Sequence, residues 1–219
     1  MTHPAYLLAR LNPKNVRHDV GAGGLPDLTP ADIAAALAFV PEGLGREMIL
    51  RVWWPDGAKL TAADLDQLLM EAQLAEWMDR GRALLDAQLL EATADTADRK
   101  RYARLRMETA KLRMWPRIGG GSCYKPIRDA VLSEISAASK CAVCQGRGIV
   151  LIDRRVAGCT ACEGLGHARV SDRARAEMIG KDQAAYRRHY AKVYEWTFNL
   201  CHDAMSPALA QFRHAVGEV

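Results

Sequence analysis

Apolar residues recur every three or four positions through most of this chain, the spacing of one face of an α-helix. The clearest case begins at Thr61 and runs to a break at 93–96. Its apolar positions are Leu65, Leu68, Leu69, Ala72, Ala75, Met78, Leu85 and Leu89. A basic helix is predicted next, over 97–114, with Tyr102, Leu105, Thr109 and Leu112 along one side.

Shorter helices are predicted on either side of this pair. Thr29-Pro30 is a strong helix start, because a capping hydroxyl precedes a proline at the first helical position, and Pro41 ends the helix. Further helices are expected over about 43–52, from Pro126, over 172–179 and over 183–205. Two short segments, the apolar Ile149–Ile152 and the basic Arg154–Val156, can pair as a β-hairpin.

We therefore expect a mostly α protein in three parts. Residues 1–28, with their prolines and Gly-Ala-Gly-Gly, predict a flexible or extended lead-in. Residues 29–118 form a helical N-terminal region, and residues 122–219 form a region that contains a zinc ribbon at 141–166 and a helix-turn-helix at 171–205.

Composition is that of an ordinary soluble globular protein, with 49% hydrophobic and 26% charged residues in a chain of 219. No apolar run approaches the ~20 residues that cross a bilayer, and the N-terminus does not read as a signal peptide. Six cysteines fit a reducing cytoplasm better than secretion. Cys123 and Cys201 stand outside any motif and are expected to pack as small apolar groups.

Charge is unevenly placed. Residues 60–98 carry nine acids against two arginines, whereas residues 99–128 carry ten Lys/Arg against one acid. Residues 140–192 are also basic, with eleven Lys/Arg against five acids. The basic segments suggest a polyanionic partner. The alternative is that acidic and basic helices pack together and neutralise one another.

Two copies of one short motif, Cys-x2-Cys-x-Gly-x-Gly, begin at 141 and at 159, and we call each copy a knuckle. Together they place Cys141, Cys144, Cys159 and Cys162 in a C-x2-C-x14-C-x2-C pattern, which suits one tetrahedral zinc ion. Such a closed site leaves no position for water, so the zinc is expected to be structural. A disulfide framework is the alternative reading of the same spacing, and His167 is an unneeded substitute ligand.

The C-terminal segment matches a helix-turn-helix. Gly180 stands at the expected turn, with Ala176 at the contact between the helices and Tyr186, Tyr190 and Val193 on the inner face. The N-terminal half of the second helix is the half that enters a major groove. It would present Lys181, Gln183, Arg187 and Arg188 outward. A plain helical hairpin with a basic solvated face is the alternative, since Arg175 and Lys181 replace usual apolar residues.

The order of these parts resembles the antitermination protein Q family of lambda-like bacteriophages. The resemblance covers roughly residues 125–205: a helix with Val131-Leu132-Ser133-Glu134-Ile135, the two knuckles, and a helix with Tyr186-Arg187-Arg188 and Cys201-His202. It implies the zinc ligands Cys141, Cys144, Cys159 and Cys162. It also implies DNA contacts from Arg173, Arg175, Lys181, Gln183, Arg187 and Arg188.

The resemblance implies a transcription factor that is not an enzyme. Its partners would be double-stranded DNA near a late promoter and bacterial RNA polymerase, with the sigma factor as a further candidate contact and no membrane. A zinc-containing helix-turn-helix repressor or activator without antitermination activity is the main alternative. A client-binding zinc module of the chaperone type is less favoured, because two of its four knuckles and its His-Pro-Asp signature are missing. No HExxH, P-loop or Ser/His/Asp order suggests an enzyme.

Overall fold

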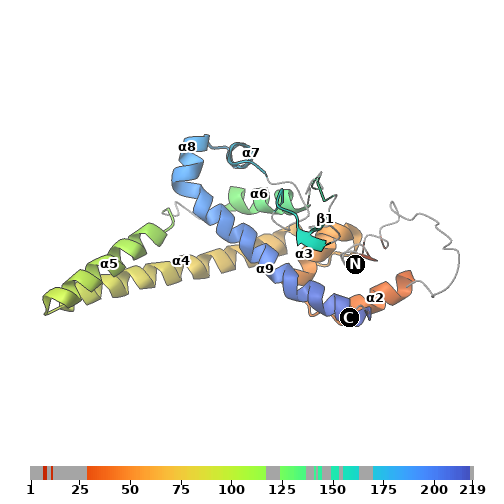
Figure 1. The fold of residues 1–219 in the computed structure, drawn as a ribbon, viewed down its shortest axis with the longest axis horizontal. Coiled ribbons are helices and arrows are strands. Elements are labelled where there is room, and N and C mark those ends of the chain that lie inside the picture. The colour runs from red at the N-terminus through yellow and green to blue at the C-terminus, as the bar shows by residue number, and fades with distance from the viewer. Residues whose placement is uncertain are drawn as a thin grey trace. The chain divides into compact units, whose positions relative to one another are not determined.

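The computed structural model describes residues 7, 8, 11, 29–116, 124–136, 141, 143, 144, 149–152, 155–162 and 170–217. The chain is mostly helical, as expected (Figure 1). The glycines of the two knuckles, Cys123 and His167 lie outside these residues.

Within residues 29–116, which the structure describes without a gap, the chain forms four α-helices and one 3₁₀ turn. They are α2 (Pro30–Ala38), α3 (Leu44–Trp53), the 3₁₀ turn Pro55–Gly57, α4 (Ala62–Thr93) and α5 (Ala97–Arg113). Their starts follow the sequence signals. Thr29 caps α2 with a reciprocal Thr–Asp32 pair, and the Thr61 hydroxyl accepts from the Asp64 amide in the same way.

The second half contains α6 (Lys125–Ser136), a two-stranded antiparallel sheet, and the C-terminal helices. Strand β1 (Ile149–Ile152) pairs with β2 (Arg155–Gly158), with Ile149 opposite Gly158. The helices are α7 (Asp172–Met178), α8 (Gln183–Ala185), a π-helical turn (Tyr186–Tyr190) and α9 (Ala191–Ala215). Helix α9 therefore extends past residue 205, where the sequence predicted its end.

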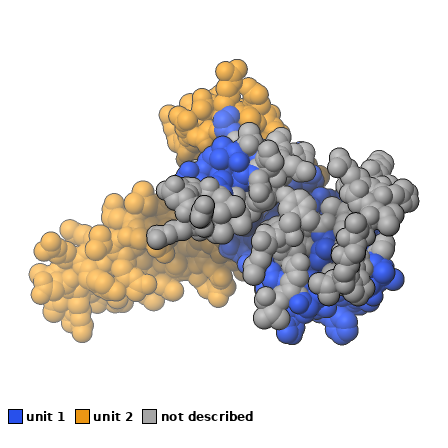
Figure 2. All heavy atoms as spheres, turned by 45° about the vertical axis from the view of Figure 1, so that its right-hand side comes forward, with its two compact units in different colours: residues 1–65, 130–171, 198–219 blue, residues 66–129, 172–197 orange. Residues whose placement is uncertain are grey.

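The chain divides into two compact units, coloured separately in Figure 2. Unit 1 contains residues 1–65, 130–171 and 198–219, and unit 2 contains residues 66–129 and 172–197. Neither unit is one continuous stretch of sequence.

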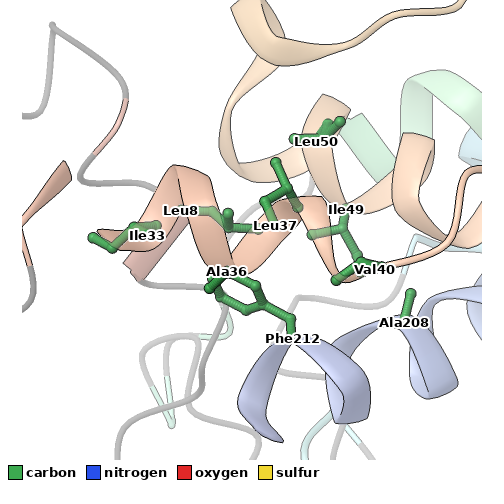
Figure 3. Close-up of a cluster of buried hydrophobic side chains, with 9 residues drawn as sticks. All are labelled: Leu8, Ile33, Ala36, Leu37, Val40, Ile49, Leu50, Ala208 and Phe212. Atoms are coloured by element: carbon green, nitrogen blue, oxygen red, sulfur yellow. The ribbon is translucent and has the colours of Figure 1, made fainter. Parts of the chain in front are cut away.

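The core of unit 1 is built on α2, α3 and the end of α9 (Figure 3). Its buried members are Leu8, Ile33, Ala36, Leu37, Val40, Ile49, Leu50, Ala208 and Phe212. Trp53 and Trp54 pack against this cluster. Leu8 is fully buried here, so the expectation of a flexible or extended lead-in does not describe this part of residues 1–28.

Unit 2 contains a hairpin of α4 and α5 and a buried polar network. The hairpin is tied by an ion pair between Arg104 and Glu91 at 3.5 Å and by the Arg80 guanidinium, which donates to the Arg113 carbonyl at 2.6 Å. The acidic and basic helices thus neutralise each other in part, as the alternative reading of the charge pattern expected.

In the described part of the chain, no helix has the length and apolar content to span a bilayer.

Candidate metal centre and basic segment

The four cysteines of the two knuckles converge on one point in unit 1. Their Sγ atoms all lie within 4.8 Å of one another, and every one of the four side chains is buried. Two of the separations are 3.9 Å, from Cys141 to Cys159, and 3.7 Å, from Cys144 to Cys162. Each of these two distances is between a cysteine of the first knuckle and a cysteine of the second.

These separations fit a metal ion. A tetrahedral ion with Zn–S bonds of about 2.3 Å places neighbouring sulfurs about 3.8 Å apart. A disulfide needs a sulfur–sulfur bond of about 2.05 Å, and all four cysteines are free. The disulfide alternative is therefore not the arrangement found. The cluster is compatible with a single structural ion.

The β1–β2 hairpin positions the two knuckles. It begins five residues after Cys144 and ends at Gly158, immediately before Cys159. Antiparallel pairing brings the two ends of the hairpin together, so the cysteines that flank it meet. Val150 packs against the sulfur cluster and shields one side of it.

Cys201 lies apart from this centre. It is fully buried in α9, and burial raises the pKa of its thiol to about 12. A neutral buried thiol is a poor nucleophile and a poor metal ligand. The expectation that it packs as a small apolar group is confirmed.

Residues 172–197 of the segment in which a helix-turn-helix was expected lie in unit 2, and residues 171 and 198–205 lie in unit 1. Helix α7 ends in a Schellman motif: Gly180, at φ +66°, donates to the Glu177 carbonyl, and the Lys181 amide donates to the Ala176 carbonyl. Asp182 then caps α8, because its carboxylate accepts from the Ala185 amide at 2.9 Å. These amide contacts lower the pKa of Asp182 below its ordinary value. The turn is thus defined on both sides.

The helix after this turn starts irregularly. Residues Tyr186–Tyr190 form a π-helical turn between α8 and α9. The sequence predicted one regular helix over 183–205. A π turn inserts an extra residue and changes the direction of the side chains around it, and such turns are frequent at functional sites.

The structure places five of the six predicted DNA contacts on the surface: Arg173, Lys181, Gln183, Arg187 and Arg188. Arg187 pairs with Asp172 at 2.8 Å, and Arg173 pairs with Glu177 at 3.1 Å. From the sequence alone, Asp172 and Glu177 could only be counted against the net positive charge of residues 140–192 and not assigned as partners of particular arginines.

Arg175 is the exception among the predicted contacts. It is half-buried, with its guanidinium 4.8 Å from the centroid of the Tyr194 ring. The Tyr194 ring in turn meets the Tyr186 ring edge-on at 5.9 Å. An arginine at a position that usually holds an apolar residue is therefore accommodated by stacking on an aromatic face. The aromatic spacing of 186, 190 and 194 was the signal for this packing.

In comparisons with known proteins, no family model, no curated protein and no solved structure matches the chain.

Proposed function

We propose that this protein is a transcription antitermination factor that binds DNA near a late promoter and alters RNA polymerase so that it reads through terminators. The zinc ion would be held by Cys141, Cys144, Cys159 and Cys162 as a structural element. With all four positions taken by thiolates, it would supply folding energy to the β-hairpin and no reaction chemistry.

The observation that carries the DNA-binding part is the exposure of cationic and amide side chains beside a turn with fixed geometry. Residues 172–192 contain six Lys/Arg against three acids. Gln183 and Arg188 are exposed just after a turn held by Gly180 and Asp182. An arginine can pair with guanine or hold a phosphate, and a glutamine can pair with adenine.

Two of the arginines already have acidic partners. Arg187 and Arg173 are 62% and 78% exposed, and exposed ion pairs contribute only about 0–1 kcal/mol. Exchanging such a carboxylate for a phosphate therefore costs little. Arg175 has a different role in this proposal, since its stacking on Tyr194 fixes α7 against the following helix.

DNA binding is tested with duplexes selected from a random pool, measured by fluorescence anisotropy across a salt series. Arg188→Ala is expected to weaken binding by about 1–3 kcal/mol if Arg188 reads a base, or to reduce the salt slope by about one if it holds a phosphate. Arg213→Ala, an exposed arginine at the end of α9, is the matched control. The proposal fails if no duplex is bound at low salt, or if the two variants behave alike.

Antitermination is tested separately, by transcription in vitro from a template that carries the selected site upstream of a terminator. The expected result is more full-length transcript with the protein than without it. Occupancy of the site without read-through would instead support a repressor or activator.

A further inference from the structure

Two rows of large apolar side chains lie open on the α4–α5 hairpin. On α4 the row is Leu74, Met78, Leu85 and Leu89, and we call it the α4 seam; its members are 45–65% exposed. On α5 the row is Tyr102, Leu105 and Leu112, the α5 seam, and its members are 57–70% exposed. At 100° per residue, the α4 seam spans an arc of about 60° and the α5 seam an arc of about 80°. Each row therefore follows one narrow face of its helix, with Gly81 between Met78 and Leu85 and Thr109 between Leu105 and Leu112, unlike single apolar residues scattered over all faces.

The hairpin does not use these seams to hold itself together. The residues buried on α4 and α5 near its tip are small, Ala87 and Ala103. The polar ties between the helices come from Arg80, Glu91 and Arg104. Each helix therefore presents a second apolar side, and burying such a side is a main source of helix stability.

The charges beside the two seams are opposite and equally spaced. On α4 an acid follows a seam residue twice, at Met78-Asp79 and Leu85-Asp86. On α5 an arginine does so twice, at Leu105-Arg106 and Leu112-Arg113. Both repeats are seven residues long, which is about 10.5 Å along a helix. Over their full lengths, α4 has seven acids against two Lys/Arg, and α5 has seven Lys/Arg against two acids.

We propose that the occupant of these seams is a second copy of this chain, with the α4 seam of one copy packed against the α5 seam of the other. Heptad apolar rows pack as in a coiled coil, and flanking charges decide which helices pair. Pairing α4 with α4, or α5 with α5, would oppose like charges. Pairing α4 with α5 matches acid to arginine at the same spacing, and each copy carries both halves of this heterologous contact.

A charge exchange between two variants tests the proposal. The first is Asp79→Arg with Asp86→Arg, and the second is Arg106→Asp with Arg113→Asp. Each variant alone has like charges across the contact, so its self-association, measured by analytical ultracentrifugation without nucleic acid, is expected to weaken by at least about tenfold. An equimolar mixture pairs an acidic α4 with a basic α5 again. Association in the mixture is expected to return to the wild-type level.

The control is Lys100→Asp with Lys111→Asp, which makes the same charge change about half a turn away from the α5 seam. It is expected to associate like the wild type. Helicity by circular dichroism and metal content establish that every variant is folded. A monomeric wild type, a mixture that does not recover, or a control that weakens as much as the seam variants would each overturn the proposal. So would seam variants that associate normally but lose duplex binding, since the seam would then serve nucleic acid.

Discussion

At the scale of single residues, the structure separates charges that the sequence could only count. Arg128 was one of ten basic residues assigned to a polyanion-binding segment, yet it is 1% exposed. Its guanidinium donates to both carboxylate oxygens of Asp66, at 2.7 and 3.1 Å, and to the Gln73 side-chain oxygen at 3.0 Å. Gln73 in turn donates to the buried Thr197 hydroxyl at 2.7 Å. Nothing in local sequence distinguishes this arginine from its exposed neighbours, because its partners lie 55 and 62 residues away.

Arg128→Met tests the energetic weight of this network. Methionine keeps most of the side-chain volume but removes the guanidinium hydrogen bonds to Asp66 and Gln73, and only the longer Lys125 contact at 3.9 Å then remains at Asp66. Hydrogen bonds to charged groups contribute about 1.5–3 kcal/mol, and Asp66 keeps 22% of its side chain exposed, so the free energy of unfolding from urea titration is expected to fall by about 1.5–3 kcal/mol. Arg99→Met is the control, because Arg99 pairs with Asp95 on the surface and should change stability by less than about 1 kcal/mol. Equal losses in the two variants would contradict the assignment.

The same variant should change how stability depends on acid. The hydrogen bonds from Arg128 lower the pKa of Asp66 below its ordinary value. A carboxyl whose folded pKa is lowered stabilises the fold above its unfolded pKa of about 3.9, and this contribution is lost as pH falls through the lower folded pKa. The gap in unfolding free energy between wild type and Arg128→Met should therefore narrow below about pH 4. A constant gap would show that Asp66 is not the partner that matters.

At the scale of elements, helix starts were predictable because they are local. The capping pairs at Thr29 and Thr61 and the Thr96 cap of α5 involve residues three apart, which a sequence displays directly. The end of α9 was not predictable in this way. The sequence predicted an end at 205, two residues before Pro207, but Ala208 and Phe212 are buried in the core of unit 1. Tertiary burial here outweighs the unfavourable proline, and that burial depends on α2 and α3.

Because α3 lies in close contact with α9, a glycine-to-alanine substitution in α3 is expected to destabilise the protein, although the same substitution usually stabilises a helix. At Gly45, an added Cβ would lie 2.0 Å from the Ala204 carbonyl oxygen. Glycine to alanine inside a helix normally stabilises by about 1 kcal/mol. Because the backbone of α9 blocks the methyl group, Gly45→Ala is expected instead to lower the free energy of unfolding by roughly 1–3 kcal/mol, measured by urea unfolding.

Gly81 provides the matched control for this substitution. It lies inside α4, and an added Cβ would meet nothing within 4 Å. Gly81→Ala should therefore raise stability by about 0.5–1 kcal/mol. If both substitutions stabilise the protein, α3 and α9 do not approach each other as closely as the structure has them.

At the scale of the whole molecule, the two parts of the candidate site belong to different units. The four cysteines lie in unit 1, and the exposed arginines of α7 and of the π-helical turn lie in unit 2. The convergence of the four cysteines was predictable, because a repeated Cys-x2-Cys spacing encodes its own geometry. The partners Asp172 and Tyr194 were not, because side-chain pairing depends on how α7 packs on the next helix. Because the four cysteines all lie in unit 1, we expect that loss of the metal unfolds the β-hairpin and leaves α5 in unit 2 folded.

Cys144→Ser tests this local effect of the metal. The substitution removes one of four ligands, so the metal content by atomic emission is expected to fall from one zinc per chain to none. A short hairpin has little core of its own, and such modules depend on the metal for folding. Amides of β1 and β2 should therefore exchange with solvent rapidly in the variant. Amides of α5 should keep their protection, because α5 belongs to unit 2 and its contacts with α4 involve no cysteine. Cys201→Ala removes a buried thiol outside the cluster and should retain the metal. Unchanged zinc content in Cys144→Ser would refute the four-thiolate site, and equal loss of protection in α5 would show that the two units unfold together.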